Sequence, residues 1–199
     1  GMAGGSTDAA AVLVGVNRMF DLGFTKKELM ERGVKLGADV PYCIMRGTAL
    51  SEGIGEILTE LPAPPQCHLV IAKPQISVST KAVYGKLRVN ELAPEEHPDI
   101  DGMMAAIKNG DLDGVIERLG NVLETVTVPD HPEISEIKEI MVENGACGSL
   151  MSGSGPTVFG IYKDRELAEK ACQALREADG GRLTRQVYLT EFYNRKKAR

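Results

Sequence analysis

The sequence predicts an α+β fold in two parts, and three observations support this. An amphipathic helical pattern opens the chain. The proline-rich stretch Pro62-Ala63-Pro64-Pro65 indicates a stiff linker between two domains. Beyond the prolines the apolar patterns follow the order strand, helices, strand, strand, helix, strand, which is that of a ferredoxin-like layer. We therefore expect one domain over residues 1–62 and a second over residues 66–199, with helices on an antiparallel sheet.

Composition limits the classes of function. The 199 residues, 43% of them hydrophobic, suffice for one sizeable core or two small ones. The net charge is −5 and no basic stripe precedes the last few residues, so we do not expect a nucleic-acid partner. No apolar run is long enough to predict a membrane span, so we expect no membrane partner. We expect a soluble, intracellular protein, in which a local site can still bind a small anionic molecule.

Four cysteines, at positions 43, 67, 147 and 172, form no C-x-x-C pair. Their spacing indicates neither a zinc site nor a redox motif. Cys67, Cys147 and Cys172 fall in apolar segments, so we expect buried, reduced thiols.

Two helices and two short strands are expected in the first part. Ser6 or Thr7 is expected to cap the first helix and Gly23 to end it. Its core-facing side is predicted from the helical spacing of Ala9, Val12, Leu13, Val16 and Phe20. The capping-box sequence Thr25-Lys26-Lys27-Glu28 opens the second helix, which ends between residues 33 and 37. Strands are expected at residues 48–52 and 57–61.

The second part is expected to begin with a buried strand at residues 68–72. Helical stretches at residues 100–109 and 112–119 follow a polar loop at residues 91–99. A further helix is predicted from Ile134, Ile137 and Met141, with Pro132 in its first turn. Strands at residues 147–151 and 157–162 precede a helix with one apolar face, and a last strand is expected near residues 187–192.

The glycine-rich opening, residues 1–7, is the first candidate site. Small residues that lead into a helix leave backbone N–H groups and the positive end of the helix dipole open to a phosphate. No Gly-Lys-Ser/Thr follows and no strand precedes, so it is neither a Walker loop nor a dinucleotide fingerprint. The same residues also suit a flexible linker or a scar left by cloning.

Asp39, in Gly37-Ala38-Asp39-Val40-Pro41, is the second candidate. Pro41 disfavours helical angles at Val40, so we expect a turn that places Asp39 at a helix end. A carboxylate there can accept a proton from a substrate hydroxyl. The alternative is an ordinary turn or cap aspartate.

The third candidate is the loop Ser152-Gly153-Ser154-Gly155-Pro156. Its two glycines and two hydroxyls suit either an anion-binding nest or a plain hairpin connection. Residues 77–80 with Tyr84 add further hydroxyls and one aromatic ring, which alone indicate only a strand that leads into a helix.

Taken in order, these motifs resemble those of the GHMP small-molecule kinases over essentially the whole chain. The matches are residues 1–10 to the family's phosphate loop, residues 36–41 to its catalytic segment and residues 151–157 to its third motif. The resemblance implies the latter part of an S5-like N-terminal domain followed by a ferredoxin-like C-terminal domain. It is strongest to members that phosphorylate the 2-hydroxyl of 4-diphosphocytidyl-2-C-methyl-D-erythritol in non-mevalonate isoprenoid synthesis, and the segments 37–41 and 52–56 support this assignment.

The resemblance also implies a location, which is the bacterial cytoplasm or, in a eukaryote, the plastid stroma, together with cofactors and residue roles. ATP and Mg²⁺ are the expected cofactors, with the ATP phosphates held by Gly1, Met2, Ala3, Gly4, Gly5, Ser6 and Thr7. Asp39 is the expected catalytic base. Thr80 and Tyr84 are expected to bind substrate, the tyrosine ring against the cytosine, while Gly153, Ser154 and Gly155 support the phosphate site. The metal ligands are not assigned.

One part of the family pattern is missing. The family carries strands and a catalytic lysine before its phosphate loop, and this sequence has no lysine before Lys26. We therefore expect little or no kinase activity from the 199 residues alone.

Two other interpretations remain open. One is another GHMP kinase, such as a homoserine or mevalonate-type kinase. The other is a non-catalytic module that binds a small ligand or forms a homodimer, with Met103, Met104 and Ile107 at the interface.

Overall fold

The computed structural model describes residues 1–193 and divides into two compact units. The helical unit comprises Ala3–Ala63 and, among the described residues, Tyr193. The sheet unit comprises Gly1–Met2 and Pro64–Phe192. The basic residues from Arg195 onward lie outside the described residues. No helix within residues 1–193 is long and apolar enough to cross a membrane.

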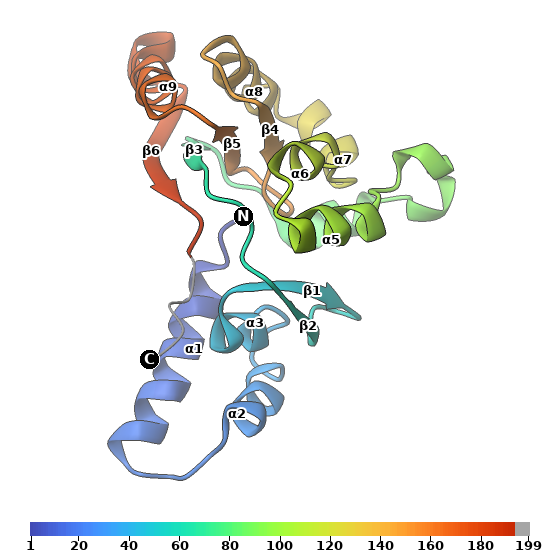
Figure 1. Ribbon diagram of the computed structural model, residues 1–199, viewed down its shortest axis with the longest axis vertical. Coiled ribbons are helices and arrows are strands. Elements are labelled where there is room, and N and C mark those ends of the chain that lie inside the picture. Colours follow the sequence, from blue (N-terminus) through green and yellow to red (C-terminus); the bar gives the residue numbers. More distant parts are fainter. Residues whose placement is uncertain (194–199) are drawn as a thin grey trace. The chain divides into compact units, whose positions relative to one another are not determined.

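The helical unit consists of three helices and a hairpin (Figure 1). The helices are α1 (Gly4–Met19), α2 (Lys26–Gly33) and α3 (Val40–Met45), and the antiparallel strands are β1 (Thr48–Glu52) and β2 (Ile57–Leu61). The capping box at Thr25 and Glu28 is present, as expected. A small core unites the three helices through Ala10, Leu29, Val40 and Ile44.

The first helix differs from its prediction in its caps and in its buried face. Its N-cap is Ala3, so Ser6 lies in the first turn, and the helix ends at Met19, before Gly23. Phe20, expected in the core, is 66% exposed, and Val12 and Val16 are exposed as well. Ala10 is buried instead, with Ala9, Leu13 and Val14 beside it. The run of apolar residues in this helix fits two overlapping stripes, and contact with α2 and α3 selects one of them.

Two short helices were not predicted. Helix α3 begins at Val40, where a turn was expected, because Pro41 lies in the first turn, where its missing N–H breaks no helical hydrogen bond. Helix α7 (Glu124–Asp130) carries Pro129 next to its last residue. Neither helix was predicted, because proline usually indicates a turn or the end of a helix.

The sheet unit has four strands in the order β4-β5-β3-β6. They are β3 (His68–Pro74), β4 (Gly148–Met151), β5 (Val158–Tyr162) and β6 (Thr184–Glu191), and every neighbouring pair is antiparallel. This is the predicted ferredoxin-like order, so the α+β fold class is confirmed.

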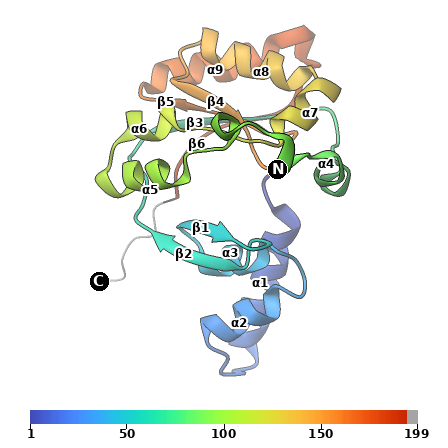
Figure 2. The ribbon, with the colours of Figure 1, turned by 90° about the vertical axis from the view of Figure 1, so that its right-hand side faces the viewer.

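Helices cover both faces of this sheet (Figure 2). Helices α8 (Glu133–Glu143) and α9 (Arg165–Glu177) bury the predicted apolar positions on one face, among them Ile134, Ile137 and Leu175, all with no exposed surface. On the other face α6 (Leu112–Glu117) packs on Leu69 and Ile161, next to α5 (Ile100–Asn109).

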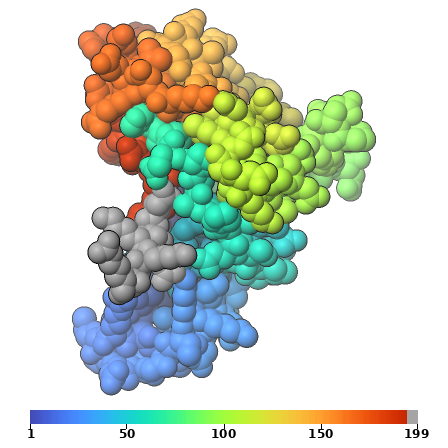
Figure 3. All heavy atoms as spheres, viewed as in Figure 1, coloured from blue at the N-terminus to red at the C-terminus, as the bar shows by residue number. Residues whose placement is uncertain are grey.

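The remaining elements connect these layers. Helix α4 (Thr80–Lys86) leads into two 3₁₀ turns, Val89–Glu91 and Pro94–Glu96, in a segment that projects from the rest of the sheet unit (Figure 3). A third 3₁₀ turn, Ala178–Gly181, follows α9.

The cysteines form no disulfide. Cys67 and Cys172 are buried, as expected, whereas Cys147 is exposed, which corrects its prediction. Cys147 directly precedes β4, where its backbone N–H donates to the carbonyl of Ile161 while its side chain faces solvent.

Candidate active site

The N-terminus of α1 is open to an anion. Ala3 has left-handed backbone angles and supplies no side-chain cap, and the first turn carries no acidic residue. The first backbone N–H groups of a helix have no partner within it, so here they are available to a ligand. A Cβ atom added at Gly4 or Gly5 would meet nothing within 4 Å. The helix end therefore has both the donors and the space that a phosphate needs.

Asp39 lies beside this helix end. A Cβ atom added at Gly37 would lie 3.8 Å from the hydroxyl oxygen of Ser6, so the segment that carries Asp39 approaches the first turn of α1. Thr7 Oγ1 lies 3.6 Å from Cys43 Sγ, on the helix that Asp39 precedes.

The carboxylate of Asp39 is exposed, and although the residue occupies the N-cap position of α3, its side chain makes no capping hydrogen bond. Among residues 1–193, no ion pair involves it. Asp39 therefore lies in a turn at the start of a helix, as the alternative of an ordinary turn or cap aspartate also expects, while its carboxylate remains available to a ligand.

The turn of the β1–β2 hairpin supports the Asp39 segment. Gly55 has φ 120°, and a Cβ atom there would lie 3.4 Å from the carbonyl oxygen of Ala38. Glu56 braces the turn by accepting a hydrogen bond of 2.8 Å from the backbone N–H of Ile54. The segment 52–56 thus packs against the backbone next to Asp39.

In the sheet unit, residues 152–156 form the hairpin connection between the antiparallel strands β4 and β5. Gly153 and Gly155 have φ 56° and 80°, angles that other residues rarely adopt. The amide of Asn121 donates to the carbonyls of Met151 and Gly153, at 2.8 Å each. The loop is therefore held at its start and at its first glycine.

Two further side chains hold the same region. Glu124 accepts a hydrogen bond of 2.7 Å from the backbone N–H of Met151 and forms an ion pair of 2.7 Å with Lys138. Thr127, which is 2% exposed, donates to the carbonyl of Ser154 at 3.3 Å. The sequence analysis missed Asn121 and Glu124. Their only sequence signal is a pair of polar residues three positions apart, the second of which begins α7.

Two of the predicted site residues meet in the sheet unit. The hydroxyl oxygens of Thr80 and Ser154 lie 2.9 Å apart. Ser79 caps α4 by accepting from the backbone N–H of Ala82, which orients Thr80 at the start of the helix. Tyr84 lies one turn further along α4 and is 60% exposed. Residues four apart share a helix face, so the tyrosine ring is presented to solvent on the side of Thr80.

The seven predicted phosphate-loop residues belong to both units. Gly1 is held against the 152–156 loop, because the hydroxyl of Ser152 donates to its carbonyl. A Cβ atom at Gly1 would lie 2.6 Å from the carbonyl oxygen of Ser152, so a larger residue is excluded there. Ala3–Thr7 lie in the helical unit. Within residues 1–193, no group of three His, Cys, Asp or Glu side chains could hold a metal ion.

Comparisons with known proteins agree with these motifs. Two family models match, "GHMP kinases N terminal domain" over residues 1–47 and "GHMP kinases C terminal" over residues 103–180. Curated relatives named 4-diphosphocytidyl-2-C-methyl-D-erythritol kinase are 56% identical in Lachnospira eligens, over 97% of this chain, and 51% identical in Lachnoclostridium phytofermentans, over 98%. The chain spans 65% and 66% of the lengths of these two relatives.

Solved structures are similar as well. A crystal structure of 4-(cytidine 5'-diphospho)-2C-methyl-D-erythritol kinase is 30% identical, with a TM-score of 0.75 over 95% of this chain and 65% of that one. A homoserine kinase from Cytophaga hutchinsonii has the same TM-score at 22% identity, over 92% of this chain and 64% of that one, which shows a shared fold.

Proposed function

Because the chain belongs to the GHMP kinase family, we propose that it is part of an enzyme that transfers the γ-phosphoryl group of ATP to the 2-hydroxyl of 4-diphosphocytidyl-2-C-methyl-D-erythritol. The names of its relatives support this substrate, and their bacterial sources support action in a bacterial cytoplasm. The observation that carries the proposal is the uncapped N-terminus of α1 with the available carboxylate of Asp39 beside it.

Residues 1–7 bind the ATP phosphates in this proposal. The backbone N–H groups of Gly4, Gly5 and Ser6 provide donors at the positive end of a 16-residue helix. Mg²⁺ is bound in proteins by few side chains together with substrate phosphates. In this turn, the hydroxyl oxygens of Ser6 and Thr7 are the side-chain atoms that would bind Mg²⁺. When bound, the ion neutralises charge that develops on the phosphates.

Asp39 is the base in this proposal. Its carboxylate accepts the proton of the substrate 2-hydroxyl as that oxygen attacks the γ-phosphorus, and the bond from the γ-phosphorus to the bridging oxygen of ADP breaks. Phosphoryl transfer depends chiefly on positioning and charge stabilisation. Gly37 lies close to Ser6 and Gly55 lies close to Ala38, and these approaches position the segment that carries the carboxylate.

Substrate recognition is assigned to the sheet unit. Tyr84 stacks on the cytosine, and Thr80 donates a hydrogen bond to the substrate while it remains oriented by Ser154. Gly153, Ser154 and Gly155 support the phosphate site through a backbone that Asn121 and Thr127 hold in place.

The test is the Asp39→Asn variant in a chain extended with the part of the Lachnospira eligens relative that the match does not cover. We expect turnover to fall by at least about 100-fold, with little change in ATP affinity, because general-base catalysis contributes on this order. Asp21→Asn, at an exposed site in the same unit, is the matched control and should leave turnover unchanged.

Homoserine and mevalonate serve as competing acceptors in the same assay. Turnover faster with either of them than with the cytidine substrate would refute the assigned acceptor. Full activity of Asp39→Asn would refute the assigned base.

A further inference from the structure

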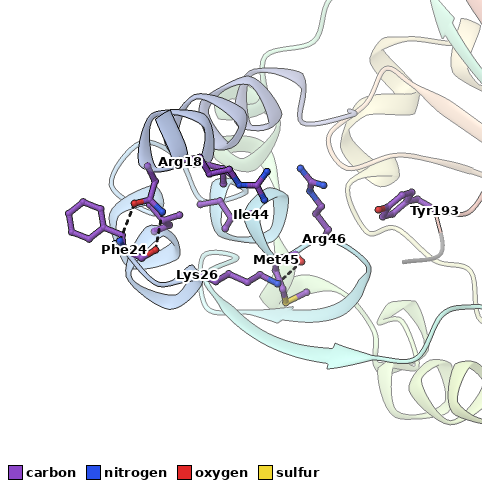
Figure 4. Close-up of a pocket in the computed structure, with 10 residues that line it drawn as sticks. Arg18, Phe24, Lys26, Ile44, Met45, Arg46 and Tyr193 are labelled. Atoms are coloured by element: carbon purple, nitrogen blue, oxygen red, sulfur yellow. Dashed lines mark hydrogen bonds between the residues drawn. The ribbon is translucent and has the colours of Figure 1, made fainter. Parts of the chain in front are cut away.

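A pocket in the helical unit joins basic side chains to an apolar floor (Figure 4). Its volume is about 280 Å³, and its lining comes from α1, α2 and α3 together with Phe24, Arg46 and Tyr193. Three basic residues line it, Arg18, Lys26 and Arg46, and none of the described lining residues is acidic. The apolar floor comprises Val14, Leu29, Ile44 and Met45.

Hydrogen bonds hold the walls of this pocket. The side-chain amide of Asn17 donates to the carbonyl of Phe24 at 2.9 Å and accepts from its N–H at 3.0 Å, which fixes the connection between α1 and α2. Lys26 Nζ donates to the carbonyl of Met45 at 2.7 Å, a link visible in Figure 4. Leu29 and Ile44 are each 6% exposed. The pocket is therefore formed before any ligand arrives, which lowers the cost of binding.

The backbone of Arg46 is strained. Its φ of 61° and ψ of 159° lie in a region that is essentially restricted to glycine and costs other residues about 1–3 kcal/mol. Within residues 1–193, no ion pair or hydrogen bond involves the guanidinium of Arg46 or of Arg18. Strain of this kind persists where the surrounding structure imposes it, and it clusters at ligand-binding sites. At Arg46 the side chain lines the pocket.

We propose that this pocket binds a small phosphate monoester that carries a short apolar chain. Guanidinium groups bind phosphate oxygens through paired hydrogen bonds, and the absence of acidic lining residues leaves both arginines to the ligand. The apolar floor of the pocket packs against the short apolar chain of the ligand. Ligand pockets usually measure about 300–1,000 Å³, so this volume selects a ligand of few atoms.

The pocket is separate from the proposed ATP site. Arg18 lies in the last turn of α1, whereas the open N–H groups lie in its first turn. At 1.5 Å of rise per residue, the 14 positions from Gly4 to Arg18 place the two sites about 20 Å apart along the helix. The ligand is therefore not the transferred phosphate of the proposed reaction.

Hexyl phosphate is the probe that tests this proposal, by calorimetry and by backbone NMR of the 199-residue chain. We expect saturable binding that is tighter than that of inorganic phosphate and weakens as NaCl is added. The shifted NMR signals should belong to residues around the pocket, such as Asn17 and Ile44.

Two variants remove one guanidinium each. Arg46→Gly should weaken binding about tenfold or more, since charged hydrogen bonds are lost, while the melting temperature is unchanged or raised because the strain is relieved. Arg18→Gln should weaken binding to a similar degree. Lys27→Gln, next to Lys26 but outside the pocket lining, is the matched control and should bind as the parent does.

Three results would overturn the proposal. They are the lack of saturable binding, parental affinity in both arginine variants, and NMR shifts confined to residues outside the pocket. Sedimentation with phosphatidate vesicles, without a saturable response to hexyl phosphate, would assign the cations to a lipid surface and would also overturn it.

Discussion

The hydroxyl groups of Thr80 and Ser154 lie 2.9 Å apart although 74 residues separate them in the chain. Thr80 begins α4, and Ser154 is buried in the loop between β4 and β5. This contact joins the residue assigned to substrate binding to the loop assigned to phosphate support.

Removing either hydroxyl tests this contact. We expect Ser154→Ala and Thr80→Val each to lower the free energy of unfolding by about 1 kcal/mol, because a partly buried hydrogen bond is lost. The double variant should lose less than the sum, since both changes remove one interaction. Urea denaturation of the four chains measures this coupling, and strictly additive losses would show that the hydroxyls do not interact.

The two glycines of the same loop should respond differently to alanine. At Gly153 an added Cβ atom meets nothing within 4 Å, so only the positive φ opposes the change and we expect a loss of about 1 kcal/mol. At Gly155 it would also lie 2.5 Å from the sulfur of Met151. We therefore expect Gly155→Ala to destabilise the chain more than Gly153→Ala in thermal unfolding. Equal losses would contradict the close contact with Met151.

The cysteines should differ in reactivity. Burial raises the pKa of the Cys67 thiol to about 11, so this thiol stays protonated at neutral pH. Cys147 is exposed. We expect a disulfide reagent to modify Cys147 rapidly and Cys67 only on unfolding, because the thiolate is the reactive form. Mass spectrometry after brief labelling identifies the modified residue, and early labelling of Cys67 would refute its burial.

The same pKa shift makes stability depend on pH. The folded-state pKa of Cys67 is raised above its ordinary value, so the folded state binds the proton more tightly and is favoured below about pH 9. This contribution is lost as the pH rises through about 11. Burial also raises the pKa of Tyr162, which adds to the loss at high pH. We expect Cys67→Ala to flatten the decline of unfolding free energy between about pH 9 and pH 11. An unchanged slope in this variant would exclude Cys67 as its source.

The 199-residue chain alone should show at most trace kinase activity. No ion pair within residues 1–193 brings a cation to Asp39, and phosphoryl transfer needs positive charge near the transferred group. The rate of ADP release, in the presence of ATP, Mg²⁺ and the cytidine substrate, measures the kinase activity of this chain. A rate close to that of the Lachnospira eligens relative would disprove the prediction.

Much of the fold follows from local pattern. The capping box at Thr25 and the spacing of Ile134, Ile137 and Met141 predict their helices, because these signals depend on residues three or four apart. The strands at 48–52 and 57–61 agree with the structure residue by residue. The order of strands and helices in the second part was sufficient to predict the ferredoxin-like sheet.

Other features required contacts between distant residues. The sequence allowed two apolar faces on α1, and packing against α2 and α3 buried Ala10 while Phe20 stayed exposed. Asn121 and Glu124 became relevant only when folding brought them to Met151, at the end of β4, and Asn121 also to Gly153 in the loop that follows.

The sequence by itself determined the motifs, the candidate residues and most helix positions, because backbone angles and helix ends depend on residues close together in the chain. Only the tertiary structure decided which hydroxyls meet, which cysteines are buried and that Arg46 lines a basic pocket, because burial and side-chain contacts depend on segments far apart in the chain.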